Sequence, residues 1–251
     1  MTLRVQDVSF SYGKRAVLEG VTFEAKSGEV TAILGANAAG KSTLLKCISG
    51  RLRPRGSIAL NGTEIARMSA HARAHAIGAM VQDSGEPARL TVMETVLLGR
   101  LHALTLKVAP AELERARTVL DRLRVGHLSA RLLTELSGGQ RRMVMLAQAL
   151  AGDPKLLLLD EPTANLDLPN ELEALRIVRE MTAEKNLITV VTLHDLNMTA
   201  RFADTVALMH EGRVIRVGCP EEALAPEAIE QAYGVKTRRV PDGGRFVIVP
   251  E

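Results

Sequence analysis

Tryptophan is absent from this chain of 251 residues, and aromatic residues make up only 2% of it. A stacking platform for single-stranded nucleic acid or for sugars therefore has almost nothing to be built from. Excess charge is also scarce, because 32 basic residues face 29 acidic residues and leave a net charge of +3. That excess is too small for a dedicated nucleic-acid binder, so nucleic acid is not expected as a partner.

Cysteines and long apolar runs are equally sparse. Cys47 and Cys219 lie far apart and fit neither a disulfide framework nor a metal-ligand spacing, so both are expected to be reduced thiols. No apolar run approaches the roughly 18 residues of a membrane span. The residues Met1–Val5 contain no signal-peptide core. These absences predict a cytosolic protein.

The composition that is present is that of a soluble domain, with 46% apolar and 24% charged residues. Short apolar runs predict strands at 3–10, 20–23, 30–34, 77–82, 156–159, 187–191, 205–209, 213–217 and 245–249, and a hairpin that begins near Ser57 and turns at Asn61-Gly62. The near-continuous apolar runs Leu156–Leu159 and Leu187–Val191 are typical of parallel strands that are buried on both faces.

Helical periodicity dominates from about Ser84 to Leu150. Apolar residues recur there at helical spacing, at Leu113, Ala116, Leu120 and Leu123 and again at Met143, Leu146, Ala147 and Leu150. We therefore predict an α/β fold in a single domain over residues 1–251, with a β-rich N-terminal part and a helical subdomain inserted at about residues 84–150.

The segment from Gly35 to Ser42 fits the phosphate-loop pattern G-x-x-x-x-G-K-[ST]. It directly follows a predicted strand and directly precedes a predicted helix, as the mechanism of such loops requires. Backbone N–H groups and the helix dipole can surround phosphate oxygens, Lys41 can reach the terminal phosphates, and Ser42 can ligate Mg²⁺. An ordinary glycine-rich turn is the less favoured interpretation.

Two further motifs indicate binding and hydrolysis of a nucleotide when they are considered together with this loop. Asp160 and Glu161 follow a buried strand, where Asp160 can hold Mg²⁺ through water and Glu161 can polarise an attacking water. Ser137-Gly138-Gly139-Gln140 opens a helix whose free N–H groups can meet an anion. By themselves, these segments would favour a solvated strand end and a plain Ser N-cap.

The order of the three motifs is similar to that of the ATP-binding cassette (ABC) ATPases, and the resemblance covers essentially the whole chain. It implies a P-loop core fold, ATP hydrolysis and Mg²⁺ as cofactor. Catalytic positions of the family match Glu161, His194 and Gln82, and metal-binding positions match Ser42, Gln82 and Asp160. Nucleotide-binding positions match Tyr12, Gly35, Ala36, Asn37, Ala38, Ala39, Gly40, Lys41, Ser42, Thr43, Ser137, Gly138, Gly139, Gln140 and Asp167.

The resemblance also implies individual roles. Tyr12 would stack on adenine, Gln82 would touch Mg²⁺ and water, and His194 would contact the γ-phosphate, while Asp167 lies in a loop that communicates between paired subunits. Each has a plainer alternative: a half-buried strand-end Tyr, a surface amide, a structural His, and a helix N-cap before Pro169. His71, His75, His102, His127 and His210 match no family position.

Three residues depart from the family pattern. Ala36 replaces a frequent Pro, Ala38 replaces a nearly universal Gly, and Arg142 replaces the usual Gln. If the loop keeps a left-handed conformation at Ala38, its Cβ costs about 1–2 kcal/mol. If phosphate enforces that conformation, nucleotide binding weakens by a factor of roughly 5–30. The alternative is an unstrained Ala38 with φ < 0.

The family arrangement implies a homodimer, because each ATP lies between the phosphate loop of one subunit and the Ser-Gly-Gly-Gln segment of the other. It also implies a peripheral subunit on the cytoplasmic face of the inner membrane, docked on integral-membrane permease subunits and linked indirectly to a substrate-binding protein. Some segments are similar to the ATPases of bacterial importers for iron–siderophore complexes, haem and cobalamin. These segments are Thr91–Arg100, His194–Asn197, and Tyr233–Val235 before Gly244–Pro250. As the transported substrate, a ferric siderophore is favoured over haem, and haem over cobalamin. A zinc or manganese importer and an ABC ATPase of iron–sulfur assembly are the alternatives.

Overall fold

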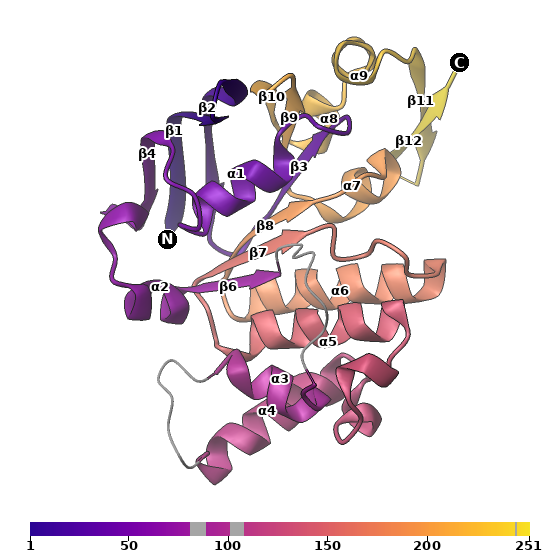
Figure 1. Ribbon diagram of the computed structural model, residues 1–251. Helices are drawn as coiled ribbons and strands as arrows, with labels where there is room; N and C mark the ends of the chain where they lie inside the picture. Colours follow the sequence, from indigo (N-terminus) through magenta and orange to yellow (C-terminus); the bar gives the residue numbers. More distant parts are fainter. Residues whose placement is uncertain (81–88, 101–107, 244) are drawn as a thin grey trace.

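The computed structural model describes residues 1–80, 89–100, 108–243 and 245–251. Figure 1 shows two stacked parts, with the sheets and their short helices above and a group of helices below. The predicted α/β class is confirmed, with an antiparallel N-terminal sheet of order β2-β1-β4-β5 and a six-stranded sheet of order β10-β9-β3-β8-β7-β6. Val81 and Gln82, the end of one predicted strand, lie outside the described residues.

The N-terminal sheet contains β1 (Thr2–Tyr12), β2 (Arg15–Lys26), β4 (Arg55–Leu60) and β5 (Thr63–Glu64). The first two strands are longer than predicted, because exposed residues alternate with buried ones along them and interrupt the apolar signal. The hairpin at Asn61-Gly62 is confirmed, since β4 pairs with β5 across that turn.

The core sheet contains β3 (Val30–Gly35), β6 (Ile77–Met80), β7 (Leu156–Asp160), β8 (Ile188–Thr192), β9 (Thr205–His210) and β10 (Arg213–Gly218). Every residue of β3, β7 and β8 is buried. Their side chains fill two cores, with Leu157 and Leu159 on one face of the sheet and Leu156 and Leu158 on the other. The parallel pairing of β3, β7 and β8 brings their carboxyl ends to one edge.

The helices beside the core sheet are α1 (Lys41–Ile48), α2 (Ala70–Ala76) and α6 (Leu168–Glu184). The lower helical group contains α3 (Val92–Leu98), α4 (Pro110–Arg122) and α5 (Gly138–Ala151), which pack against one another. These three helices follow β6 and precede β7 in the chain. Short 3₁₀ helices lie at Ile65–Arg67, Gly126–Leu128 and Leu133–Glu135.

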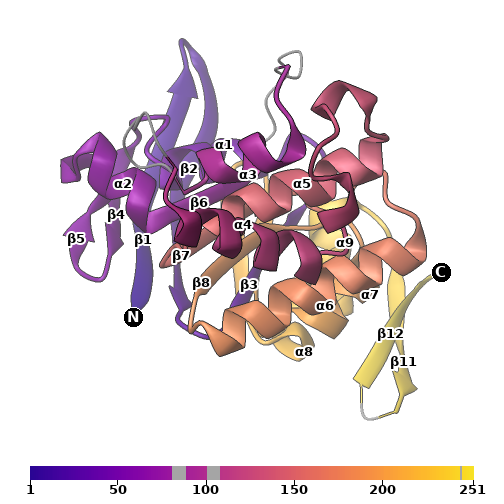
Figure 2. The ribbon, with the colours of Figure 1, turned by 90° about the horizontal axis from the view of Figure 1, so that it is seen from below.

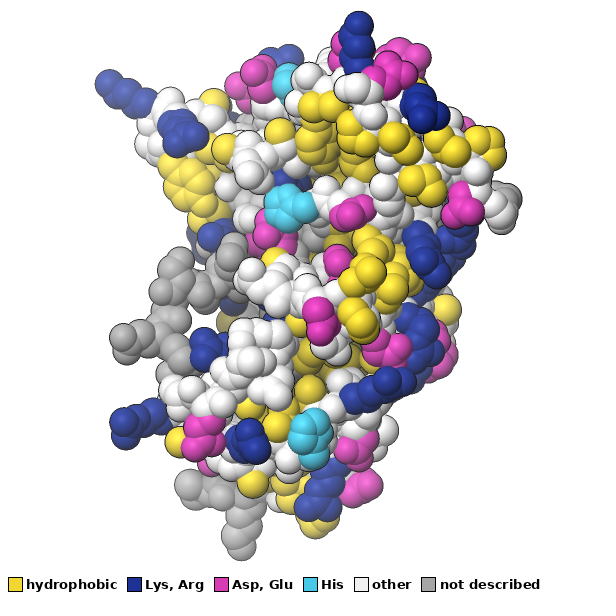
Figure 3. Space-filling view, turned by 90° about the vertical axis from the view of Figure 1, so that its right-hand side faces the viewer, with side chains coloured by type: hydrophobic (Ala, Val, Ile, Leu, Met, Phe, Trp, Pro, Cys, Tyr) yellow, Lys and Arg dark blue, Asp and Glu magenta, His cyan; other side chains and the backbone are white. Residues whose placement is uncertain are grey.

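The C-terminal unit is defined here as α7 (Leu196–Phe202), α8 (Pro220–Ala223), α9 (Pro226–Tyr233) and the hairpin of β11 (Thr237–Asp242) with β12 (Arg245–Pro250). The β12 strand was predicted and β11 was not. Figure 2 shows the hairpin beside α7 and α8. Figure 3 views the molecule from the right-hand side of Figure 1 and shows apolar side chains gathered in the upper part of that face, at the height of the hairpin.

Hydrogen bonds dock this hairpin on its neighbours. The side chain of Asn197 exchanges two hydrogen bonds with the backbone of Ile248. The guanidinium of Arg239 donates to the carbonyl oxygens of Leu224 and Glu221 and covers the ring of Phe246. The hairpin is therefore tied to both α7 and α8.

Candidate nucleotide site

A pocket of ≈ 420 Å³ opens at the carboxyl end of β3. It has the predicted phosphate loop at its centre, since that loop connects β3 with α1. The residues lining it are Tyr12, Arg15, Val17, Asn37, Ala38, Ala39, Gly40, Lys41, Ser42, Thr43 and Glu161. Most of the predicted phosphate-binding residues therefore share one pocket with Tyr12 and Glu161.

Lys41 begins α1 and folds back over the loop. Its ammonium group donates to the carbonyl oxygens of Gly35 at 2.7 Å and Ala36 at 3.1 Å. Burial lowers the pKa of Lys41, and the nearby carboxylates Glu161 and Asp160 oppose that shift. This residue thus places a positive charge inside the loop, where terminal phosphates of a nucleotide can be met.

Ala38 has a φ of +65°, so the predicted left-handed conformation is confirmed and the alternative of an unstrained Ala38 is wrong. Two glycines of the loop, Gly35 and Gly40, also have positive φ values of +152° and +100°. The Cβ of Ala38 therefore carries a strain of about 1–2 kcal/mol that glycine would not have.

We expect Ala38→Gly to raise the free energy of unfolding by up to about 1 kcal/mol, because added flexibility of the unfolded chain offsets part of the relief. The melting temperature should rise by about 2–4 °C for a domain of this size. Thermal unfolding of the protein without nucleotide, followed by titration with ATP, measures both effects. If bound phosphate adds to the strain at Ala38, the Kd of the Ala38→Gly protein for ATP is also lower than that of the wild-type protein.

Ala39→Gly is the matched control, because Ala39 is buried and its φ is not positive. This control should lower the melting temperature. Equal melting temperatures of Ala38→Gly and the wild-type protein, combined with equal Kd values for ATP, would contradict the strain at Ala38.

Asp160 ends β7 and is the centre of a small hydrogen-bond network. Its Oδ1 atom accepts from the hydroxyls of Ser42 at 3.1 Å and Thr192 at 2.8 Å. Among the described residues, its buried Oδ2 atom has no hydrogen-bond partner. A buried carboxylate oxygen without a partner beside a serine hydroxyl fits the oxygen ligands that Mg²⁺ prefers, so Ser42 and Asp160 are suited to hold this ion.

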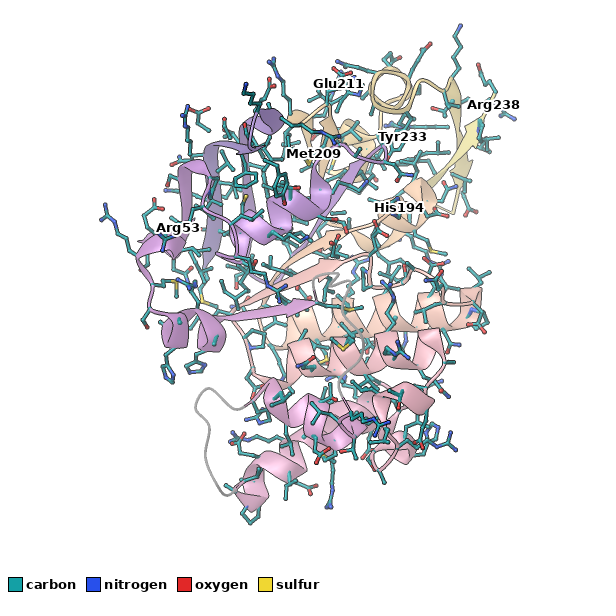
Figure 4. All side chains as sticks on the ribbon, in the orientation of Figure 1. Arg53, His194, Met209, Glu211, Tyr233 and Arg238 are labelled. Carbon is teal, nitrogen blue, oxygen red and sulfur yellow. The ribbon has the colours of Figure 1, made fainter. Side chains whose placement is uncertain are left out.

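Glu161 follows Asp160 and has a φ of +50°, in the left-handed region. Its Oε1 atom lies 2.6 Å from Nε2 of His194, which follows β8. Its amide donates to Thr192 Oγ1 at 2.8 Å, and its carbonyl oxygen accepts from the guanidinium of Arg142 on α5. The structure thus brings together the two predicted catalytic residues that it describes, Glu161 and His194. Figure 4 labels His194.

The Ser137–Gln140 segment forms the start of α5. Ser137 is the N-cap and accepts from the Gln140 amide at 3.2 Å, while the Gln140 side chain accepts from the Ser137 amide at 3.1 Å. Both Ser137 and Gly138 are exposed, and Gly139 lies against Leu166. This segment does not line the phosphate-loop pocket of its own chain.

The remaining predicted residues take simpler positions. Tyr12 ends β1 with half of its surface exposed, and its ring meets Phe10 edge-on at 4.9 Å between centroids. Asp167 is the N-cap of α6 and accepts from the amide of Asn170 at 3.1 Å, as its plainer alternative predicted. Gln82 lies outside the described residues.

Sequence reasoning missed two contributions to the site. Thr192 joins the amide of Glu161 to the carboxylate of Asp160, although the sequence placed it only as the residue after a strand. Arg142 was identified only as a departure from the family pattern, and the structure places its guanidinium on the carbonyl of Glu161. In the pairing of β7 with β8, Asp160 lies opposite Thr192. Alignment of the two predicted strands in this register would have placed Thr192 beside Asp160.

A phosphate loop after a buried strand, with an acidic pair at the end of a neighbouring strand and a helical insertion, defines a P-loop nucleotide hydrolase of the cassette type. The family model described as "ABC transporter" matches residues 18–164. The chain belongs to the ABC transporter family, as an ATPase.

Named relatives extend the match to nearly the whole chain. The hemin import ATP-binding protein HmuV of Gloeobacter violaceus is 38% identical over 99% of this chain and 94% of its own length. The ferric enterobactin transport ATP-binding protein FepC of Escherichia coli is 33% identical over 99% of this chain and 93% of its own length.

Solved structures give the same result. A chain from the structure of a metal-chelate type ABC transporter in an inward-facing conformation superimposes with a TM-score of 0.84, at 29% identity over 100% of this chain and 97% of that one. The cassette MJ0796, solved as a dimer, has a TM-score of 0.78 at 26% identity over 87% of this chain and 98% of that one. Within the described residues, none of the helices combines the length and apolar character needed to cross a membrane.

Proposed function

We propose that this chain is the ATP-hydrolysing subunit of an importer for iron–siderophore complexes or haem. The observation that carries this proposal is the extent of the similarity. The general family model ends at residue 164, whereas hemin and ferric enterobactin import proteins match through the C-terminal unit as well, over 99% of the chain.

The phosphate loop would bind the phosphates of ATP. Free amides at the start of α1 and the ammonium of Lys41 face the pocket that Asn37 and Thr43 help to line. Tyr12, which lines the pocket and is half exposed, offers an aromatic ring on which adenine can stack. These groups position ATP with its terminal phosphate toward Glu161.

Ser42 and Asp160 would hold Mg²⁺, which neutralises charge that develops on the phosphates. Thr192 keeps the Asp160 carboxylate in place through Oδ1, so that Oδ2 remains available. We also propose Gln82 for this shell, on the family resemblance.

Glu161 would orient the attacking water and accept its proton. Its contact with His194 aligns the carboxylate, and Arg142 and Thr192 fix its backbone from two sides. His194 is about half exposed, so its imidazole can also turn toward the γ-phosphate. Proton transfer is therefore assigned to Glu161, and phosphate recognition to His194.

The exposed start of α5 supports a homodimer. Ser137, Gly138, Gly139 and Gln140 lie away from the pocket of their own chain, so we propose that they complete the site of a second copy. Cassettes of this family dimerise, as MJ0796 does. Asp167, at the start of α6, would join this interface.

Closure of the dimer on ATP would move the permease subunits that dock on its surface at the cytoplasmic face of the membrane. These permease subunits would receive cargo from a substrate-binding protein.

The experiment that tests the cargo is purification of the chain from membranes together with its permease, followed by reconstitution into vesicles in the presence of the substrate-binding protein. We expect uptake of a ferric siderophore or hemin that depends on ATP, and no uptake of Zn²⁺. Uptake of Zn²⁺ or Mn²⁺ alone would support the nearer alternative, a zinc or manganese importer. Failure to associate with any membrane partner would instead favour an ATPase of iron–sulfur assembly.

A further inference from the structure

Tyr233 touches the phosphate loop from a part of the chain that the catalytic scheme does not use. The amide of Gly35 donates to its hydroxyl oxygen at 3.0 Å, across 198 positions of sequence. Tyr233 ends α9 in the C-terminal unit, and Figure 4 labels it near Met209 of β9, the strand that pairs with β3. Burial raises the pKa of Tyr233 to about 12, so the phenol stays neutral at physiological pH.

Gly35 is held from three directions. Its amide is bound to Tyr233, and its carbonyl oxygen accepts from the ammonium of Lys41 at 2.7 Å. A Cβ atom at this position would lie 2.5 Å from the carbonyl oxygen of Met209, so the backbone itself lies close against β9. The residue is buried and has a φ of +152°, which glycine adopts without strain. The backbone of Gly35, the first residue of the phosphate loop, is therefore held in place by these contacts.

Tyr233 does not line the nucleotide pocket, so it is not placed to touch ATP. Its own position is set by the C-terminal unit. Ala228, Ile229 and Ala232 bury one face of α9, and Gly234 ends the helix with a φ of +71°. The elements that α9 packs against include β9 and β11. A shift of this unit would move the hydroxyl that holds the first residue of the loop.

We propose that Tyr233 is a positioning residue for the phosphate loop, through which the C-terminal unit sets the affinity of the site for nucleotide. The hydroxyl fixes the Gly35 amide and so aligns the amides that follow it toward the phosphates. The proposal depends on nucleotide binding alone, and it holds whatever cargo the transporter carries.

The variant Tyr233→Phe tests it, because the ring stays and only the acceptor is lost. Loss of one hydrogen bond predicts that KM and the Kd for ATP both rise about two- to tenfold, while kcat at saturating ATP changes less than twofold. Thr237→Val is the matched control, since Thr237 in β11 has a buried hydroxyl for which the described residues supply no partner. This control should keep the KM and Kd of the wild-type protein.

The split between KM and kcat distinguishes positioning from general stability. A Tyr233→Phe protein with a lowered melting temperature and an unchanged KM would overturn the proposal. An equal rise of KM in Tyr233→Phe and Thr237→Val would overturn it too, because the effect would then belong to any change in the C-terminal unit.

A second measurement needs no substitution at Tyr233. The chain has two tyrosines, so labelling with 3-fluorotyrosine gives two fluorine NMR signals, and Tyr12→Phe identifies the signal of Tyr233. Coupling between sites is reciprocal, so a hydroxyl that strengthens nucleotide binding must itself respond to bound nucleotide. The Tyr233 signal should shift at saturating ADP, and a signal that does not move would overturn the proposal.

Discussion

Glu161→Gln is expected to lower ATP turnover by at least about 10²-fold, the loss typical of a missing general base. The amide keeps the shape of the side chain and an oxygen that can still face Nε2 of His194, 2.6 Å from Oε1 in the native protein. Binding of ATP should therefore survive, and a dimer with ATP trapped in it should accumulate. Steady-state turnover, ATP affinity and size-exclusion chromatography with ATP measure these three effects.

Glu211→Gln is the matched control for this substitution. Like Glu161, Glu211 has a positive φ, of +45°, and a carboxylate near an imidazole, that of His210 at 4.0 Å. Its side chain is 85% exposed, however, and Glu211 does not line the pocket. It should turn over ATP at the wild-type rate. Wild-type turnover in Glu161→Gln would instead remove Glu161 from the mechanism.

Mixing Lys41→Ala with Ser137→Arg is expected to restore ATP-dependent dimers that neither variant forms alone. In the mixed dimer, one site combines both substitutions, and the other keeps a native Lys41 from one chain and a native Ser137 from its partner. The expectation follows from the position of Ser137, which is exposed and lies outside the pocket of its own chain. Analytical ultracentrifugation with and without ATP measures the result.

Ser137→Arg also removes the N-cap of α5, which costs about 1 kcal/mol irrespective of any dimer. Ser69→Arg is a control for this loss, because Ser69 caps α2 by accepting from the amide of Ala72. The Ser69→Arg protein should dimerise with ATP as the wild-type protein does. Normal dimerisation of Lys41→Ala and of Ser137→Arg, each alone, would show that the site is not shared.

The sequence by itself determined the features that neighbouring residues encode. The phosphate loop could be found because its glycines, Lys41 and Ser42 lie within eight positions between a strand and a helix. The buried strands β7 and β8 were found because burial on both faces leaves continuous apolar runs. The left-handed turn at Ala38 was anticipated from the glycine that the family pattern places there.

The tertiary structure alone decided the contacts between distant segments. The strand β11 was missed because Arg238, Arg239 and Asp242 give it a polar pattern, and its pairing with β12 supplies the hydrogen bonds that make it a strand. The roles of Thr192 and Tyr233 were hidden for a related reason. Each acts on a residue that lies far away in sequence, and its partner is fixed only when the sheet aligns β7 with β8 or when α9 packs beside β9. Local sequence encodes backbone preference and burial, whereas the partner of a side chain depends on how all the elements pack.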